Sequence, residues 1–164
     1  MGGSALDIGK RITINPEGNI FVVGYTSSSD FPTTSGTSSA YSTSFNGGPY
    51  DVFVSVLDKN LTTLHASTYL GGSSSDRAYS AVIDPNGNVY IAGYTSSSDF
   101  PATSNAYNTS YNQEDAFIAK LDGDLTSLTA ATYLSGSAYD RVNSIAIDAE
   151  GSIYSIRLKP MASV

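Results

Sequence analysis

Hydrophobic and polar residues alternate along the chain in short segments that end at glycine, proline, asparagine or aspartate. Residues 77–84 place Ala81 and Ile83 on one face, the period of two that is typical of a half-buried β-strand. Residues 20–25 and 89–94 are apolar on both faces, which predicts strands that are buried from both sides. The same pattern predicts further strands at 51–58, 64–70, 115–122 and 128–134.

The strands recur in the same order because the sequence itself is repeated. Residues 14–32 return at 83–101 with thirteen of nineteen positions identical, and residues 51–84 return at 115–148 with eighteen of thirty-four identical. The start of the unit appears a third time at 147–154. The copies differ in length only between the second and third strands, where the first copy is five residues longer. Insertions are tolerated in surface loops and not within paired strands, so this stretch is predicted to be a loop.

Each unit therefore has four short antiparallel strands, and its inner strands are apolar on both faces. Such a sheet must pack between two similar sheets, which is the arrangement of a β-propeller blade. A two-sheet sandwich would not require units this similar, and the coils of a parallel β-helix are much shorter. We predict a first blade at 2–70, a second at 71–134, two strands of a third at 135–155 and a divergent tail at 156–164. This is an incomplete propeller of about two and a half repeats, because a ring needs roughly four blades or more.

The repeated motif resembles the SBBP-type β-propeller repeat of bacteria and archaea. The residues that carry the resemblance are Asp84 to Phe100, with the pattern D-x-x-G-N-V-Y-x-x-G-x-T-x-S-x-D-F, then Asp115 to Asp122 and Thr132-Tyr133-Leu134. The resemblance implies a blade architecture within large secreted or surface proteins, and an extracellular or cell-surface location. It implies neither a ligand nor a catalytic activity.

The third unit departs from this pattern midway, because residues 155–160 lack the signature found at 91–96. Terminal blades without neighbours would leave apolar faces bare, and the last strand would have an open edge. The free face of the first blade complements the free face of the last, and such head-to-tail contacts close into rings or extend into filaments. We therefore expect the chain to associate with copies of itself; the alternative is a fragment whose other blades belong to the same polypeptide.

Composition excludes several classes of function. The chain has 42 serines and threonines, no cysteine, no tryptophan and one histidine, which excludes disulfide scaffolds, structural zinc sites of cysteine and cysteine nucleophiles. The net charge of −7 argues against binding to nucleic acid or to anionic membranes. No apolar stretch approaches the roughly 18 residues of a membrane span, so membrane insertion is not expected either. The first residues also lack the pattern of a secretory signal.

No constellation of residues points to catalysis. His65 is the single imidazole and Thr129 replaces it in the second unit, and no Gly-x-Ser-x-Gly elbow precedes a helix. A glycosidase needs two carboxylates, but the acids here recur at equivalent positions, which favours a structural role. The recurring pairs are Asp30 and Asp99, Asp51 and Asp115, Asp58 and Asp122, and Asp76 and Asp140. Asp76-Arg77 and Asp140-Arg141 are expected to form inter-blade ion pairs or turn caps.

No cofactor is expected. Asp84-x-Asn86-x-Asn88 superficially resembles the start of a calcium loop, but Gly87 stands at the fourth position, where an EF-hand needs glycine at the sixth. A β-hairpin turn explains these residues fully, because Gly87 supplies the positive φ that such a turn needs.

The loop after the second strand of each unit is the best candidate for ligand binding, since long loops tend to be functional or self-packed. Its aromatic, hydroxyl and amide side chains suit sugars and polar polymers. The candidate residues are Tyr41, Phe45, Tyr107, Tyr111, Asp30 and Asp99. Alternatively, Phe31 and Phe100 plug the blade edge and the two aspartates cap turns.

The sequence thus favours a non-enzymatic protein with a structural or adhesive role at the cell surface, whose partners are copies of itself. One alternative is a lectin-like propeller module that binds glycans or other surface polymers. A second is an accessory fragment of a larger secreted enzyme.

Overall fold

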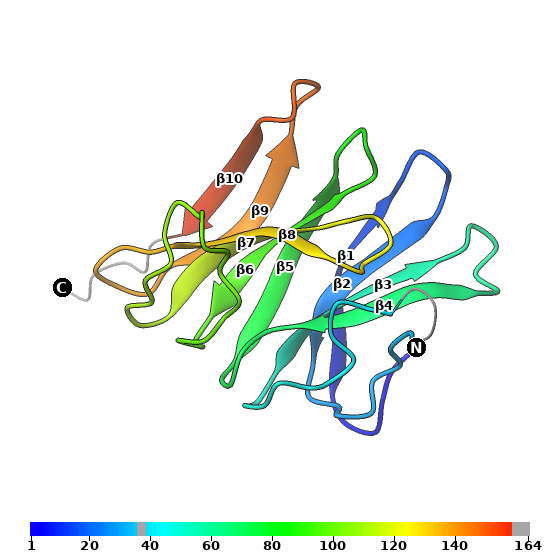
Figure 1. Ribbon diagram of the computed structural model, residues 1–164, viewed down its shortest axis with the longest axis horizontal. Helices are drawn as coiled ribbons and strands as arrows, with labels where there is room; N and C mark the ends of the chain where they lie inside the picture. The colour runs from blue at the N-terminus through cyan, green and yellow to red at the C-terminus, as the bar shows by residue number, and fades with distance from the viewer. Residues whose placement is uncertain (36–38, 159–164) are drawn as a thin grey trace.

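The computed structural model describes residues 1–35 and 39–158, which form three separate antiparallel sheets (Figure 1). The first sheet has the order β1-β2-β3-β4 and the second the order β5-β6-β7-β8. The third contains only β9 and β10. The strands are β1 (Asp7–Ile14), β2 (Ile20–Thr26), β3 (Asp51–Leu57), β4 (Leu64–Leu70), β5 (Asp76–Ile83), β6 (Val89–Thr95), β7 (Asp115–Leu121), β8 (Leu128–Leu134), β9 (Arg141–Ile147) and β10 (Ile153–Leu158).

The prediction of β-propeller blades is confirmed, and the sheets do not close into a ring. In Figure 1 the sheets stand side by side like an open fan, with the two termini on opposite sides. We call β1–β4 the first blade, β5–β8 the second blade and β9–β10 the half-blade. The last strand reaches Leu158, so it continues into the segment 156–164 that the sequence sets apart as a tail; residues 159–164 lie outside the described residues.

The hairpin turns follow from glycine at fixed positions. Gly18, Gly87 and Gly151 have φ values of 90°, 86° and 87°, and each closes the turn between the first two strands of its unit. The turns lie along the same upper edge of the fan in Figure 1. A second requirement for glycine arises at Gly24 and Gly93, where the backbone of the first strand bulges toward the second strand. A Cβ atom on Gly93 would lie 1.9 Å from the carbonyl oxygen of Arg77.

Stacking of the blades buries the core. We call the face of a blade that is turned toward the preceding blade its front and the opposite face its rear. The first joint, between the first and second blades, is a continuous apolar cluster that includes Val23 and Val54 from the first blade and Ala81 and Phe117 from the second. The second joint, between the second blade and the half-blade, buries a smaller cluster around Ala92, Ala116, Val142 and Ile145.

Candidate functional site

Asp76, the first residue of β5, and Asp140, just before β9, cap turns. Asp76 Oδ2 accepts hydrogen bonds from Gly72 N at 2.8 Å and from the Ser97 hydroxyl at 2.9 Å. Asp140 Oδ2 likewise accepts from Gly136 N at 2.5 Å. Both carboxylates therefore hold the turn through which one blade leads to the next.

The neighbouring arginines, Arg77 and Arg141, contact residues of the preceding blade. The Arg77 guanidinium of the second blade lies over the rings of Tyr25 and Tyr50 of the first blade, at 5.0 and 4.3 Å from their centroids. Arg141 of the half-blade lies 4.5 Å from the Tyr94 centroid and forms an ion pair with Glu114, both of the second blade. The ion pair with Glu114 and the stacking of both arginines on tyrosine rings therefore link neighbouring blades.

Asp30 and Asp99 cap the loop that precedes their blade. Asp30 Oδ1 accepts from Ser4 N at 2.8 Å, and Asp99 Oδ1 accepts from Ser73 N at the same distance. These backbone hydrogen bonds are the main reason that the pKa of each carboxyl lies below its ordinary value. The carboxylates are thus engaged within the fold, although both residues are exposed.

The aromatic residues of the loop divide into two groups. Phe31 stacks on Phe53 at 4.4 Å between centroids, and Phe100 on Phe117 at 4.6 Å, so both phenylalanines fill the edge of their own blade. Phe45 and Tyr111 extend these clusters, since each packs at 6.0 Å against a buried tyrosine, which is Tyr69 for Phe45 and Tyr133 for Tyr111.

The two buried tyrosines anchor the loop to the outer strand. The Tyr69 hydroxyl donates to Ser28 O at 2.7 Å, and the Tyr133 hydroxyl donates to Ser97 O at 3.0 Å. Burial raises the pKa of Tyr133 to about 12.

Tyr41 and Tyr107 form the second group, because their rings reach the surface. Tyr107 is 90% exposed and borders a hollow of about 430 Å³ on the rear of β7 and β8. Ile118, Ala130 and Thr132 line this hollow. In the first blade the equivalent positions are covered by the second blade, and the Tyr41 backbone N–H donates to Leu125 O across the first joint. Tyr107 therefore borders a part of the rear of the second blade that the half-blade leaves open.

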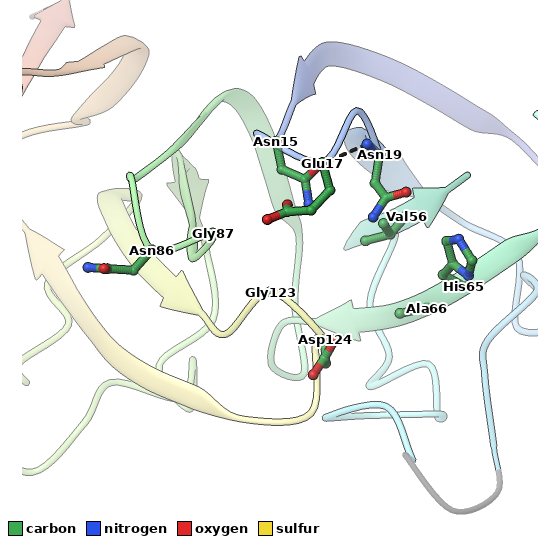
Figure 2. Close-up of a pocket in the computed structure, with 10 residues that line it drawn as sticks. All are labelled: Asn15, Glu17, Asn19, Val56, His65, Ala66, Asn86, Gly87, Gly123 and Asp124. Carbon is green, nitrogen blue, oxygen red and sulfur yellow. Dashed lines mark hydrogen bonds between the residues drawn. The ribbon is translucent and has the colours of Figure 1, made fainter. Parts of the chain in front are cut away.

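A polar hollow of about 600 Å³ opens at the first joint, which the sequence did not predict (Figure 2). Figure 2 shows that the turn between β1 and β2, the turn between β5 and β6 and the turn between β7 and β8 surround it, with β4 at its side. The hydrogen-bonding side chains along its wall are Asn15, Glu17, Asn19, His65, Asn86 and Asp124. No local sequence signal marks this site, because three turns from two blades build it.

The turn considered for calcium is occupied by internal hydrogen bonds. Asp84 Oδ1 accepts from Asn86 N and Asn88 N, both at 2.9 Å, and Oδ2 lies 3.3 Å from Lys120 Nζ. These contacts stabilise the charged form and leave the pKa of Asp84 below its ordinary value in spite of burial. Within residues 1–35 and 39–158, no group of three or more acidic or histidine side chains is placed to hold a metal ion.

Two carboxylates lie close together inside the first joint. Asp51 and Asp76 are both fully buried, and a Cβ atom on Gly71 would lie 3.0 Å from Asp51 Oδ1 and 2.7 Å from Asp76 Oδ2. Burial raises the pKa of Asp51 to about 7, and the negative charge of Asp76 adds to the effect. Burial also raises the pKa of Asp76, to about 6. Because Asp51 and Asp76 each recur at an equivalent position, the sequence indicated a structural role in every unit. It did not indicate that the two residues lie close together.

The described part of the chain contains no helix that could cross a lipid bilayer. A search of curated proteins found no match to the chain. A scan against family models matched the β-propeller repeat called SBBP at residues 2–32 and again at 67–101. The two matches each cover the first two strands of a blade and the start of the following loop. Residues 2–32 and 67–101 are therefore similar in sequence to the SBBP β-propeller repeat, and the stacked four-stranded antiparallel sheets agree with that similarity.

Proposed function

We propose that the chain is a non-enzymatic assembly module whose blades stack head-to-tail with copies of itself. The observation that carries the proposal is that each terminal blade exposes the same positions that the second blade buries. The first joint supports the proposal, because there one blade packs its front against the rear of another blade.

The free front lies on the first blade. Ile12 is 64% exposed, whereas its equivalents Ala81 and Ile145 are 0% and 4% exposed because each packs against a preceding blade. Leu61 shows the same contrast, since it is exposed while its equivalent Leu125 is fully buried in the first joint. The front of the first blade is therefore shaped to receive the rear of another blade.

The free rear lies on the half-blade. Ile156 of β10 is 63% exposed, whereas its equivalents Val23 and Ala92 are fully buried under the next blade. Tyr154 is also exposed, whereas its equivalent Phe21 is fully buried and its equivalent Tyr90 is half-buried. Covering a large apolar side chain contributes about 1.5 to 3 kcal/mol, so several such positions together favour association. A front and a rear that differ from each other give a heterologous contact, which repeats from copy to copy.

The direction of assembly can be tested with one charge on each face. In sedimentation velocity the wild-type chain is expected to form a series of species, whereas Ile12→Asp alone and Ile156→Asp alone are expected to remain monomers. An equimolar mixture of the two variants is expected to form a dimer and nothing larger, because one intact front meets one intact rear.

Tyr139→Ser serves as a matched control, because Tyr139 is exposed in the loop between β8 and β9 and serine stands at the equivalent position 75. This variant is expected to assemble as the wild type does. A wild-type chain that stays a folded monomer at micromolar concentration would overturn the proposal. A mixture of the two charged variants that stays monomeric would overturn the head-to-tail direction.

A second candidate function is glycan binding in the polar hollow of the first joint, favoured by its amide, carboxylate and imidazole side chains, which suit hydroxyl groups. A glycan array probed with the wild type and with Asp124→Ala tests it. Binding that is lost in the variant supports this function, and an array without signal excludes it for the glycans displayed.

An extracellular or cell-surface location forms part of the proposal and is supported by the secreted and surface proteins in which repeats of this type occur. Fractionation of the source cells, with detection of the chain by antibody, is the corresponding test. Recovery from the cytosolic fraction alone would contradict it.

A further inference from the structure

We propose that Asn46 is a site of spontaneous deamidation, and that this modification weakens the first joint. Asparagine followed by glycine is the dipeptide in which a backbone nitrogen most easily reaches the preceding side-chain amide, because glycine has no side chain to obstruct the approach. The chain contains two such dipeptides, Asn46-Gly47 and Asn86-Gly87. The fold holds them in different ways, and only the first is free to react.

The reaction needs no reagent other than water. Gly47 N attacks Cγ of Asn46, the bond from Cγ to the amide nitrogen breaks, and ammonia leaves with the proton that Gly47 N gives up. Water then opens the resulting succinimide ring at either of its two carbonyl carbons. The product at position 46 is aspartate or isoaspartate, and in isoaspartate the backbone runs through the side chain and is one methylene longer.

The two dipeptides differ in the hydrogen bonds of their backbone. Gly87 N donates to Asp84 O at 2.9 Å, and Asn86 N donates to Asp84 Oδ1 at the same distance, so the turn between β5 and β6 holds both nitrogens. Asn46 is exposed, and Gly47 N makes no hydrogen bond within residues 1–35 and 39–158. Gly47 N can therefore attack without first breaking a hydrogen bond.

Deamidation at this position changes the surroundings of a buried acid. Asn46 N donates to Asp51 Oδ2 at 2.6 Å, and Asp51 is fully buried. The amide hydrogens of Asn46 act to lower the pKa of Asp51 and so oppose part of the rise that burial causes. The modification replaces the side-chain amide with a carboxylate, which removes donor hydrogens and adds a negative charge near Asp51. Such a charge disfavours the ionised form of Asp51.

The loop before β3 also packs closely against the segment that leads into the second blade. A Cβ atom on Gly48 would lie 2.3 Å from Ser74 O, and Tyr50 O accepts a hydrogen bond from Asp76 N at 2.7 Å. Isoaspartate lengthens the backbone just before these contacts, so the loop has to shift. The added charge and the longer backbone thus both act on the first joint.

Peptide mass spectrometry of the full chain, incubated for days at mildly alkaline pH, tests the site. The mass gain of an amide converted to an acid is expected to accumulate at Asn46 roughly tenfold faster than at Asn86, because the hydrogen bond of Gly87 N must break first. Asn112 is the matched control at the equivalent position of the second unit. Asn112 N likewise donates to Asp115 Oδ2, but Gln113 follows it in place of glycine, so Asn112 is expected to keep its amide.

Asn46→Gln separates this modification from other effects of incubation. Glutamine keeps an amide, and its longer side chain would have to close a six-membered ring, which forms far more slowly. Incubated wild type is expected to unfold at a lower urea concentration than fresh protein, whereas incubated Asn46→Gln is expected to keep its midpoint. The site is overturned if Asn46 reacts no faster than Asn86 or Asn112. The weakening of the joint is overturned if deamidated and fresh protein share one midpoint.

Discussion

The two joints differ in how many strands cover the rear of a blade. At the first joint the second blade, with four strands, packs on the rear of the first blade, and Ala66, Thr68 and Leu70 of β4 are all buried. The second joint covers the rear of the second blade with two strands only, and Ala130 of β8, the equivalent of Ala66, is exposed. Each blade is therefore a complete four-stranded sheet, but its apolar side chains are fully buried only where a neighbouring blade covers them.

The largest expected effect separates two equivalent leucines. Leu125 is fully buried in the first joint, whereas Leu61 is 64% exposed at the front of the first blade. Both have a positive φ, 57° and 61°, so any backbone effect of a substitution is similar at the two positions. Leu125→Ala is expected to lower the free energy of unfolding by about 3 to 4 kcal/mol, and Leu61→Ala by less than about 0.5 kcal/mol.

Urea denaturation of the dilute protein, with Ile156→Asp in both variants to suppress assembly, measures this difference. Equal losses of stability would mean that the second blade does not depend on the first in the way that the burial of Leu125 indicates.

A pH dependence is expected from the acids of the first joint. The pKa of Asp51 is raised to about 7 in the folded protein, and that of Asp76 to about 6, chiefly by burial. Between pH 4 and pH 7 the folded state therefore binds more protons than the unfolded state, and stability falls as the pH rises through this range. The two shifts together correspond to a decline of roughly 6 kcal/mol over this range.

Unfolding in urea at a series of pH values, with a chelator present throughout, measures this effect. Asp51→Asn keeps an uncharged amide at every pH and is expected to leave only the smaller decline that Asp76 contributes. A flat curve for the wild type would contradict the assignment of raised pKa values to this pair.

The arginines of the two joints give a smaller contrast. Arg77 lies over three tyrosine rings, at 5.0, 4.3 and 5.7 Å, whereas Arg141 lies over one ring and its side chain is about half exposed. Cation–π contacts contribute more when they are shielded from water. Arg77→Met, which keeps the length of the side chain, is expected to cost about 2 kcal/mol, and Arg141→Met about 0.5 to 1 kcal/mol.

Thermal unfolding of both variants ranks the two residues. An equal loss at the two positions would show that the extra rings around Arg77 contribute nothing beyond the first.

The sequence predicted the strands and the blade because both depend on local alternation and on an exact repeat. The segments predicted at 89–94 and 128–134 correspond closely to β6 and β8. Contacts between blades were harder to predict from the sequence. Tyr50, for example, contacts Arg77 from a loop that carries no periodic pattern. The proximity of Asp51 and Asp76 was also not predictable, because it depends on how one sheet leads into the next.

The smallest expected effect concerns Lys120, whose equivalent in the first blade is Val56. Lys120 Nζ lies 3.3 Å from Asp84 Oδ2, and its side chain is partly exposed on the open rear of the second blade. Lys120→Val makes this position identical to the first blade. Asp84 keeps the hydrogen bonds from Asn86 and Asn88, so the loss of the ion pair is expected to change the free energy of unfolding by less than about 1 kcal/mol. Because the pair is only partly shielded, its contribution is expected to disappear at high salt, and urea denaturation of wild type and variant should then give the same midpoint. A variant that stayed clearly weaker in high salt would show that the lysine supports the rear of the second blade through packing of its chain rather than through its charge.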